Sequence, residues 1–259
     1  MTPFSTPAAL RAAIARGEWR QPTAGLLDGY QQANLVVLPQ SAAYEFLLFC
    51  VRNPKACPVL AVSEPGETEI LMGTSRIDLR TMFPRYRVWQ QGQLVDEPYD
   101  LLDVWQDDAV AFLLGCSHSL DGALRRAGIP VSLAAPPVYL TQVPCQPTAR
   151  MQGYVAVSMR PVAADKVDEA VALSAAYPSA HGLPLHIGDP AGIGITDLAA
   201  PDFGVFPGVK SGQVPLFWAC GVTPQQVLPA LGCAYLFTHY AGHMLVLDDA
   251  VEHYSAQLR

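Results

Sequence analysis

The sequence predicts a mixed α/β protein in which a mixed-sheet core lobe with helices on its faces joins a smaller α+β lobe. Apolar runs of strand length alternate with segments of helical period along all 259 residues, and 51% of the residues are hydrophobic. No internal repeat or low-complexity segment interrupts this pattern. We place the core lobe at residues 1–130 and 191–259 and the smaller lobe at 131–190, a division that is also compatible with one compact unit.

The first helix is predicted in AALRAAIA, where Thr6 can cap the start, Pro7 fits the first turn and Gly17 suits the residue past the end. The rest of the first half predicts, in order, a strand at 34–39, a helix at 41–50, a strand at 58–63, a segment around 70–72, a hairpin turning near Gly92, and helices at 107–114 and 120–127. The second half predicts strands at 138–143 and 153–159, a helix at 167–177, a strand at 215–221, a helix from 223, strands at 234–237 and 243–247, and a terminal helix.

Composition excludes several classes of partner. The net charge of -7 and the pI near 5.3 oppose binding to nucleic acid and to anionic membrane surfaces. No apolar run reaches the roughly 18 residues of a membrane span. With 15% charged residues and a mean hydropathy of +0.20, the chain is expected to be compact and able to form homo-oligomers.

The six cysteines are expected to be reduced thiols in a cytoplasmic protein. Cys50, Cys116 and Cys220 end apolar runs, where a thiol behaves as a small hydrophobe, and a chain of this length needs no disulfides. No CxxC pair is present, so a zinc site built on thiolates is not expected.

The segment VPLFWACGVTPQQV places a helix start directly after a buried strand. Gly221 breaks the strand, and Thr223 and Pro224 suit the first positions of the helix. Free N–H groups and the positive end of a helix dipole at this point favour a carboxylate or phosphate. The same residues fit the start of an ordinary surface helix equally well.

Two further segments concentrate histidines. HGLPLHIGDPAGIGITDL carries His181, His186 and Asp189 in a loop rich in glycine and proline, and THYAGHM carries His239 and His243 in a predicted turn between strands. The glycines of the first segment do not follow GxGxxG, and no Walker motif is present, so no nucleotide cofactor is expected. The histidines fit bonds to nearby carbonyl groups, or a zinc or iron site completed by carboxylates, but nothing in the sequence requires a metal.

CSHSLD brings Cys116, Ser117, His118 and Asp121 together, yet it lacks the context of a covalent hydrolase, and we interpret Cys116 as buried. Arg80, Arg85 and Arg160 are the arginines that could pair with a substrate carboxylate, although each also fits a surface position.

Several segments in one order resemble the D-glutamate cyclase family, whose bacterial members are also called YcsI-like hydro-lyases. They are GYQQANLVVLP, FCVRNPKACPVLAV, DLRTMFPRYRV, FLLGCS, VSMRPV, HGLPLHIGDPAGIGITDL, PDFG, VPLFWACGVTPQ and THYAGHM, and they span nearly the whole chain. The resemblance implies an α/β fold with a second, smaller lobe and a reversible dehydration that closes D-glutamate to 5-oxo-D-proline. His118 and Asp121 stand where the family typically has Phe and Glu, and Asp121 is one methylene shorter than that Glu.

Cyclisation needs groups that move protons and groups that hold a carboxylate. We expect His186 and His243 to share proton transfer, with Asp189 orienting one imidazole. The remaining candidate catalytic residues are His181 and His239, and the candidate substrate-binding residues are Arg160, Gly221, Thr223, Cys116 and Asp121. No cofactor is expected, and the partner is a small carboxylate or amino acid. Two other readings stay open: a metal-dependent hydratase of a small acid, and a non-catalytic carboxylate-binding protein.

Overall fold

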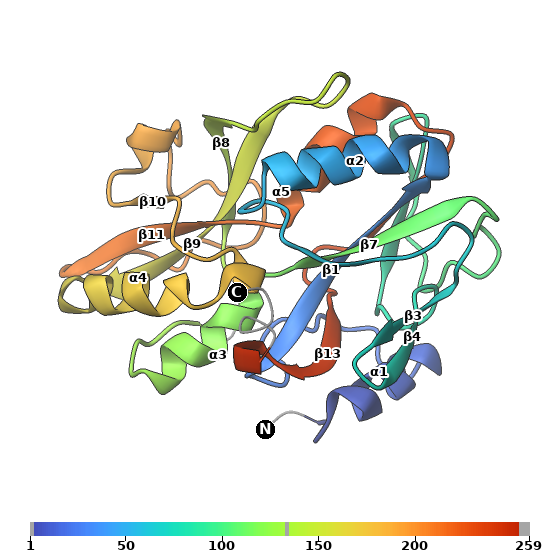
Figure 1. Cartoon of the computed structure of the whole chain (residues 1–259). Coiled ribbons are helices and arrows are strands. Elements are labelled where there is room, and N and C mark those ends of the chain that lie inside the picture. Colours follow the sequence, from blue (N-terminus) through green and yellow to red (C-terminus); the bar gives the residue numbers. More distant parts are fainter. Residues whose placement is uncertain (1–2, 133–134, 254–259) are drawn as a thin grey trace.

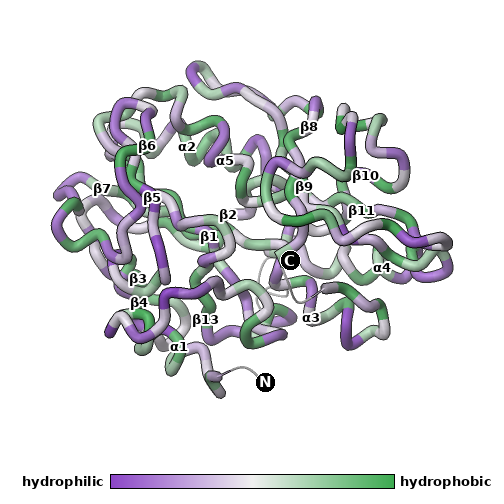
Figure 2. Tube along the Cα trace, turned by 180° about the vertical axis from the view of Figure 1, so that it is seen from behind, coloured by the Kyte–Doolittle hydropathy of each residue, from purple (hydrophilic) through white to green (hydrophobic). Residues whose placement is uncertain are grey.

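Two antiparallel sheets lie side by side in the computed structural model, which describes residues 3–132 and 135–253 (Figure 1). The larger sheet has the strand order β2-β7-β1-β12-β5-β6, with β13 also paired to β1, and the smaller has the order β10-β11-β9-β8. Figure 2 shows the same division from behind, with β3, β4 and α1 on the side of the larger sheet and α4 and β10 on the side of the smaller one.

The strands of the larger sheet are β1 (Tyr30–Pro39), β2 (Val59–Val62), β5 (Tyr86–Gln90), β6 (Gln93–Asp96), β7 (Ala109–Gly115), β12 (Leu236–His239) and β13 (Leu245–Ala250). The smaller sheet contains β8 (Val138–Pro144), β9 (Tyr154–Ala163), β10 (His186–Ile187) and β11 (Gln213–Ala219), and β3 (Glu69–Met72) pairs only with β4 (Ser75–Asp78). The helices are α1 (Pro7–Ala15), α2 (Gln40–Arg52), α3 (His118–Arg126), α4 (Val167–Ala175) and α5 (Val222–Val227), with 3-10 turns η1 (Ala164–Lys166), η2 (Pro178–Ala180), η3 (Pro190–Ile193) and η4 (Leu228–Leu231).

The predicted start of α1 is confirmed. The Thr6 hydroxyl accepts a hydrogen bond from the N–H of Ala9 at 3.2 Å, which satisfies one of the free donors of the first turn. Gly17 follows the helix with a φ of +74°, a left-handed conformation that favours glycine. The hairpin predicted near Gly92 is also confirmed, by β5 and β6.

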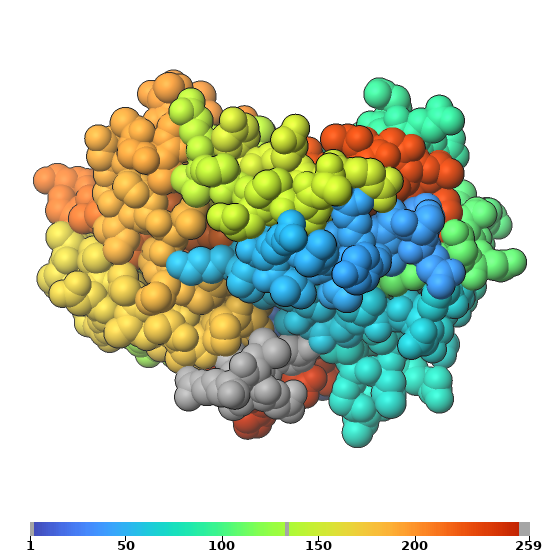
Figure 3. All heavy atoms as spheres, turned by 45° about the horizontal axis from the view of Figure 1, so that its top comes forward, coloured from blue at the N-terminus to red at the C-terminus, as the bar shows by residue number. Residues whose placement is uncertain are grey.

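A shared apolar core joins the two sheets. Phe46 of α2 packs edge-on against Phe112 of β7, with ring centroids 4.8 Å apart, and both belong to a buried cluster that also holds Tyr139 of β8 and Phe217 of β11. In Figure 3 the atoms of α2, in blue, lie between the parts of the chain that form the two sheets. The cavity described below therefore lies in a framework that both sheets support.

The helix predicted at 107–114 is wrong, because this segment forms strand β7. Its residues 109–115 are all buried, and β7 is paired on one side with β1 and on the other with β2. A strand buried on both faces has a continuous apolar run, and such a run has no period of two that would distinguish it from a buried helix.

Two other expectations concern the ends of the predicted units. Residues 213–219 form β11 of the smaller sheet, although we expected everything after residue 190 to belong to the core lobe. Residues 251–253 are helical, and the rest of the predicted terminal helix, 254–259, lies outside the described residues. Across the described part of the chain, no helix combines the length and apolar character needed to cross a membrane.

Candidate active site

Two strand-to-helix junctions, one from each sheet, meet at a cavity of about 210 Å³. Strand β7 ends at Gly115, and Cys116 and Ser117 lead into α3. Strand β11 ends at Ala219, and Cys220 and Gly221 lead into α5. The polar and thiol side chains that line the cavity are Asn34, Cys116, Ser117, His118, Ser158, Cys220 and His239.

Asn34 of β1 connects the two junctions. Its Nδ2 donates a hydrogen bond to the carbonyl oxygen of Gly115 at 2.7 Å. The same Nδ2 lies only 2.1 Å from the position that a Cβ would take at Gly221, so a larger residue cannot fit there without displacement. Gly221 is therefore needed for space, since its φ of -64° is open to any residue.

A buried ion pair lies behind the two serines that line the cavity. Arg160 Nε donates to Asp121 Oδ1 at 2.5 Å, and the two side chains are 3% and 6% exposed. The other guanidinium nitrogens donate to the Ser158 hydroxyl at 3.0 Å and to the Ser117 carbonyl and hydroxyl at 3.3 Å. The two hydroxyl groups are themselves 3.1 Å apart. Arg160 of β9 thus fixes both serines that line the cavity.

Asp121 also holds His118. The His118 Nδ1 lies 3.1 Å from Asp121 Oδ2, and both residues lie on α3 three positions apart. Burial acts to raise the pKa of Asp121, but attraction to Arg160 and the hydrogen bond from His118 outweigh it, so the pKa is lowered. Asp121 is therefore an ionised carboxylate at neutral pH.

His239 is held neutral by burial. Its Nδ1 lies 3.2 Å from the N–H nitrogen of Leu35 and 3.5 Å from the carbonyl oxygen of the same residue, and we assign the shorter contact as the hydrogen bond, with Nδ1 as the acceptor. Burial lowers the pKa of His239 to about 4, although the neighbouring Leu35 backbone opposes this. A neutral imidazole whose Nδ1 accepts carries its proton on Nε2, so His239 offers the cavity a hydrogen-bond donor.

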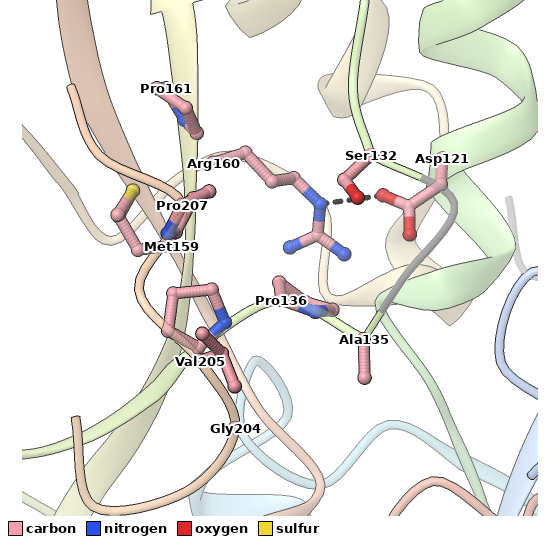
Figure 4. Close-up of a pocket in the computed structure, with 11 residues that line it drawn as sticks. Asp121, Ser132, Ala135, Pro136, Met159, Arg160, Pro161, Gly204, Val205 and Pro207 are labelled. Carbon is pink, nitrogen blue, oxygen red and sulfur yellow. Dashed lines mark hydrogen bonds and ion pairs between the residues drawn. The ribbon is translucent and has the colours of Figure 1, made fainter. Parts of the chain in front are cut away.

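A second cavity, of about 400 Å³, lies beside the ion pair and shares Ala135, Pro136 and Gly204 with the first. Figure 4 shows Asp121 and Arg160 at this cavity, joined by their ion pair, with apolar side chains around it. Those apolar residues are Ala135, Pro136, Pro137, Met159, Pro161, Val205 and Pro207. The Asp121–Arg160 pair thus borders this second cavity, while the serines that Arg160 binds line the first, which we call the polar cavity for the hydroxyl, amide and imidazole groups on its otherwise apolar wall.

Part of the predicted site is brought together here. Cys116 and His239 line the polar cavity, Arg160 and Asp121 lie behind its two serines, and Gly221 packs against Asn34. Burial raises the pKa of the Cys116 thiol to about 12, which agrees with our interpretation of Cys116 as an unreactive buried side chain.

The predicted capping role of Thr223 is wrong. Gly221 occupies the cap position of α5, and the Thr223 hydroxyl instead donates to the carbonyl oxygen of Cys220 at 2.8 Å and accepts from the N–H of Ala156 at 3.0 Å. Thr223 is completely buried, so it ties α5 to β9.

His186 and Asp189 lie apart from this cavity, next to β11 of the smaller sheet. The His186 Nε2 is 2.6 Å from the backbone oxygen of Asp189, whereas the Asp189 carboxylate accepts from the N–H of Ala191 at 3.0 Å. The carboxylate therefore begins the turn η3 and does not orient the imidazole as we expected. Neither residue lines the polar cavity.

His181 and His243 are close to the site without lining it. The His243 Nδ1 is 2.9 Å from the carbonyl oxygen of Ala241, in the turn whose other residues do line the cavity. His181 is 1% exposed, and its Nδ1 lies 2.6 Å from the carbonyl oxygen of Lys55. Burial lowers the pKa of His181 to about 4, with the carbonyl of Lys55 acting against it.

The residues that sequence reasoning did not select are Asn34, Ser117, Ser158, Cys220 and His118. Ser117 and His118 stand in CSHSLD and Cys220 stands in VPLFWACGVTPQQV, both segments that drew attention for their chemistry. Ser158 and Asn34 stand in VSMRPV and GYQQANLVVLP, which were quoted only for the family resemblance. Across residues 3–132 and 135–253, no group of three or more His, Cys, Asp or Glu side chains is arranged to hold a metal ion.

The fold and the cavity define a mixed α/β protein in which a partly open cavity between two sheets carries hydroxyl, amide, thiol and imidazole groups. A sequence profile of the family described as D-glutamate cyclase matches residues 110–248. A protein of Stutzerimonas stutzeri named "Putative hydro-lyase" is 48% identical over 247 residues, covering 94% of this chain and 93% of its own. Relatives with the same name in Bacillus licheniformis and Geobacillus kaustophilus are each 48% identical, covering 93% and 92% of this chain and 94% and 92% of their own.

The chain belongs to the D-glutamate cyclase family and is an enzyme of the carbon–oxygen lyase class. Among solved structures, a nitrogen repressor-like protein of Methanococcus jannaschii is similar over 94% of this chain and 95% of that one, with a TM-score of 0.42 and 11% identity. A likeness this distant says nothing about activity.

Proposed function

We propose that the protein interconverts D-glutamate with 5-oxo-D-proline and water in the polar cavity. The observation that carries this proposal is a cavity of about 210 Å³ whose mostly apolar lining includes hydroxyl, amide and imidazole groups. This volume lies below the range of about 300–1,000 Å³ that is usual for drug-sized ligands, which suits an amino acid. The family membership supplies the reaction class.

The serine pair is the proposed holder of a substrate carboxylate. Ser117 and Ser158 have two hydroxyl protons between them, and their mutual hydrogen bond uses one. The other remains to be donated into the cavity. Arg160 donates to both hydroxyl oxygens, which polarises them and strengthens such a bond to an anion. Arg160 thus acts through the serines, and its own charge is balanced by Asp121.

His239 is the proposed donor to the side-chain carboxyl group that reacts. Its pKa of about 4 keeps the ring neutral at physiological pH, and the bond from Leu35 to Nδ1 fixes the proton on Nε2. Oxygen charge increases when the amine adds to the carboxyl carbon. A donor fixed before the reaction stabilises that charge without rearranging.

We place the reaction in the cytoplasm, with a free amino acid as the substrate, in a protein able to form homo-oligomers. The six cysteines are all free thiols, which fits a reducing compartment.

The test is an NMR assay of the purified protein with D-glutamate and, separately, with 5-oxo-D-proline, using the L-isomers as controls. We expect D-glutamate and 5-oxo-D-proline to reach the same final mixture, and the corresponding L-compounds to stay unchanged. The S117A/S158A double variant should raise KM at least tenfold, because a lost hydrogen bond to a charged group costs about 1.5–3 kcal/mol. Tight binding of D-glutamate without turnover would instead identify a carboxylate-binding protein.

A further inference from the structure

His118 and His239 line the same cavity and differ in which ring nitrogen carries the proton. An ionised carboxylate can only accept hydrogen bonds, so the 3.1 Å contact with Asp121 requires a proton on His118 Nδ1. In neutral His118 the Nε2 atom therefore carries a lone pair. In His239 the arrangement is reversed, because Nδ1 accepts from Leu35 and Nε2 carries the proton. One histidine can accept a proton where the other can donate a hydrogen bond.

Asp121 holds the ring of His118 in place. His118 is 10% exposed and Asp121 is 6% exposed, so both are packed while His118 still lines the cavity. Arg160 binds the other carboxylate oxygen, which keeps Asp121 ionised and in position. This is the arrangement in which a carboxylate fixes the tautomer and orientation of a histidine base.

We propose that His118 is the general base of this enzyme, taking a proton from the substrate ammonium, and that Asp121 is its positioning residue. The proposal rests on the proposed cyclisation of D-glutamate. Two substitutions test this role: H118F keeps a planar ring without a basic nitrogen, and H118Q keeps a polar side chain.

The atoms balance as follows. His118 Nε2 takes one proton from the ammonium, and the resulting amine forms a C–N bond to the side-chain carboxyl carbon. His118 returns that proton to one carboxyl oxygen, and a second proton passes from the nitrogen to the same oxygen. The C–O bond then breaks and water leaves. The product keeps the single negative charge of the substrate, and no oxidant or co-reactant is needed.

The groups around His118 do not compete with it as a proton acceptor. Among the described residues, the charged neighbours are Asp121 on α3 and Arg160 on β9, which pair with each other. The other titratable groups on the same cavity are Cys116, Cys220 and His239. Burial raises the pKa of both thiols and lowers that of His239, so all three are neutral near pH 7 and His118 is the remaining proton acceptor.

The experiment compares the wild-type protein with H118F, H118Q and the surface control H253N. His253 is exposed and lies outside the cavity. We expect kcat for D-glutamate to fall about 100-fold in both His118 variants, the lower end of the usual contribution of general acid–base catalysis. KM should change less than threefold, and 5-oxo-D-proline should still raise Tm, which shows that the cavity is intact.

The pH profile separates a base from a structural residue. A general base must be unprotonated to act, so wild-type kcat/KM should decline on the acid side, and this decline should be absent from the remaining activity of H118Q. If wild-type protein turns over D-glutamate and the His118 variants match it in rate and profile, His118 is not the base. If wild-type protein does not turn over D-glutamate at all, the proposed function itself fails.

Discussion

Acid should destabilise this protein through its two buried neutral histidines, His181 and His239. Both have a pKa lowered from 6.5 to about 4, chiefly by burial. The unfolded chain takes up protons on these rings as the pH falls below 6.5, while the folded protein does not until about pH 4. The unfolded state therefore binds more protons, and stability falls as the pH falls through this window.

The magnitude follows from the width of the window. Between pH 6.5 and pH 5, each histidine costs about 1.4 kcal/mol per pH unit, which gives about 2 kcal/mol for each ring and about 4 kcal/mol for the pair. Typical domains unfold with only about 5–15 kcal/mol, so this loss is a large share of the total. Near pH 7.5 the contribution is fully retained.

Urea unfolding of the wild-type protein at pH 7.5, 6 and 5 measures this loss directly. The matched variants are H181N and H239Q, singly and combined, with H253N as the exposed control. We expect each buried substitution to remove about 2 kcal/mol of the decline between pH 7.5 and pH 5, and H253N to remove none. A double variant with the same decline as wild-type protein would refute the reasoning, because the lost stability would then have another source.

Further predictions concern the Asp121–Arg160 ion pair, the two strand-to-helix junctions at the cavity, and the need for a metal ion. Replacing Asp121 with Asn leaves the buried charge of Arg160 unpaired, so we expect a loss of about 3 kcal/mol in the free energy of unfolding measured with urea. Gly221→Ala should cost about 1–3 kcal/mol because its Cβ collides with Asn34, and the same measurement on N34S/G221A should recover part of that loss. Cys116 should resist iodoacetamide at pH 7.5 in the folded protein, by mass spectrometry, because burial raises its pKa to about 12. Chelator treatment followed by the NMR assay should leave turnover unchanged, since the described residues form no metal-binding group.

Each of these four predictions can be contradicted by a specific result. Unchanged stability of D121N would mean that Arg160 finds other compensation, and a G221A loss that N34S does not reduce would place the clash elsewhere. Rapid alkylation of Cys116 would show that the junction opens in solution. Activity lost to the chelator and restored by zinc or iron would favour the metal-dependent reading.

Local signals were sufficient for the elements whose patterns are unambiguous. The capped start of α1 and the glycine after its end depend on neighbouring residues only, and the structure confirms both. The run at 107–114 was misassigned because burial on both faces removes the alternation that identifies a strand. One face of β7 packs into the cluster that holds Phe46, and the other packs into the cluster that holds Phe83 and Phe237, residues that lie far away in the sequence.

The residues of the site could likewise be predicted only in part from the sequence. The segments CSHSLD, VPLFWACGVTPQQV and THYAGHM were recognised as chemically rich, and each contributes a residue to the polar cavity. Which histidines meet there could not be read from the chain. His186 and Asp189 are close in sequence and looked like a catalytic pair, yet their bonds serve the local turn.

The sequence by itself determined the fold class, the family and the chemical types available, because these depend on composition, period and the order of motifs. The tertiary structure alone decided that Asn34, His118, Ser158 and His239 share one cavity, and which partner the Nδ1 atom of each imidazole has. The reason is physical: the tautomer of a histidine is set by the partner of its other nitrogen. For His239 that partner is the backbone of a strand 204 residues away in the chain.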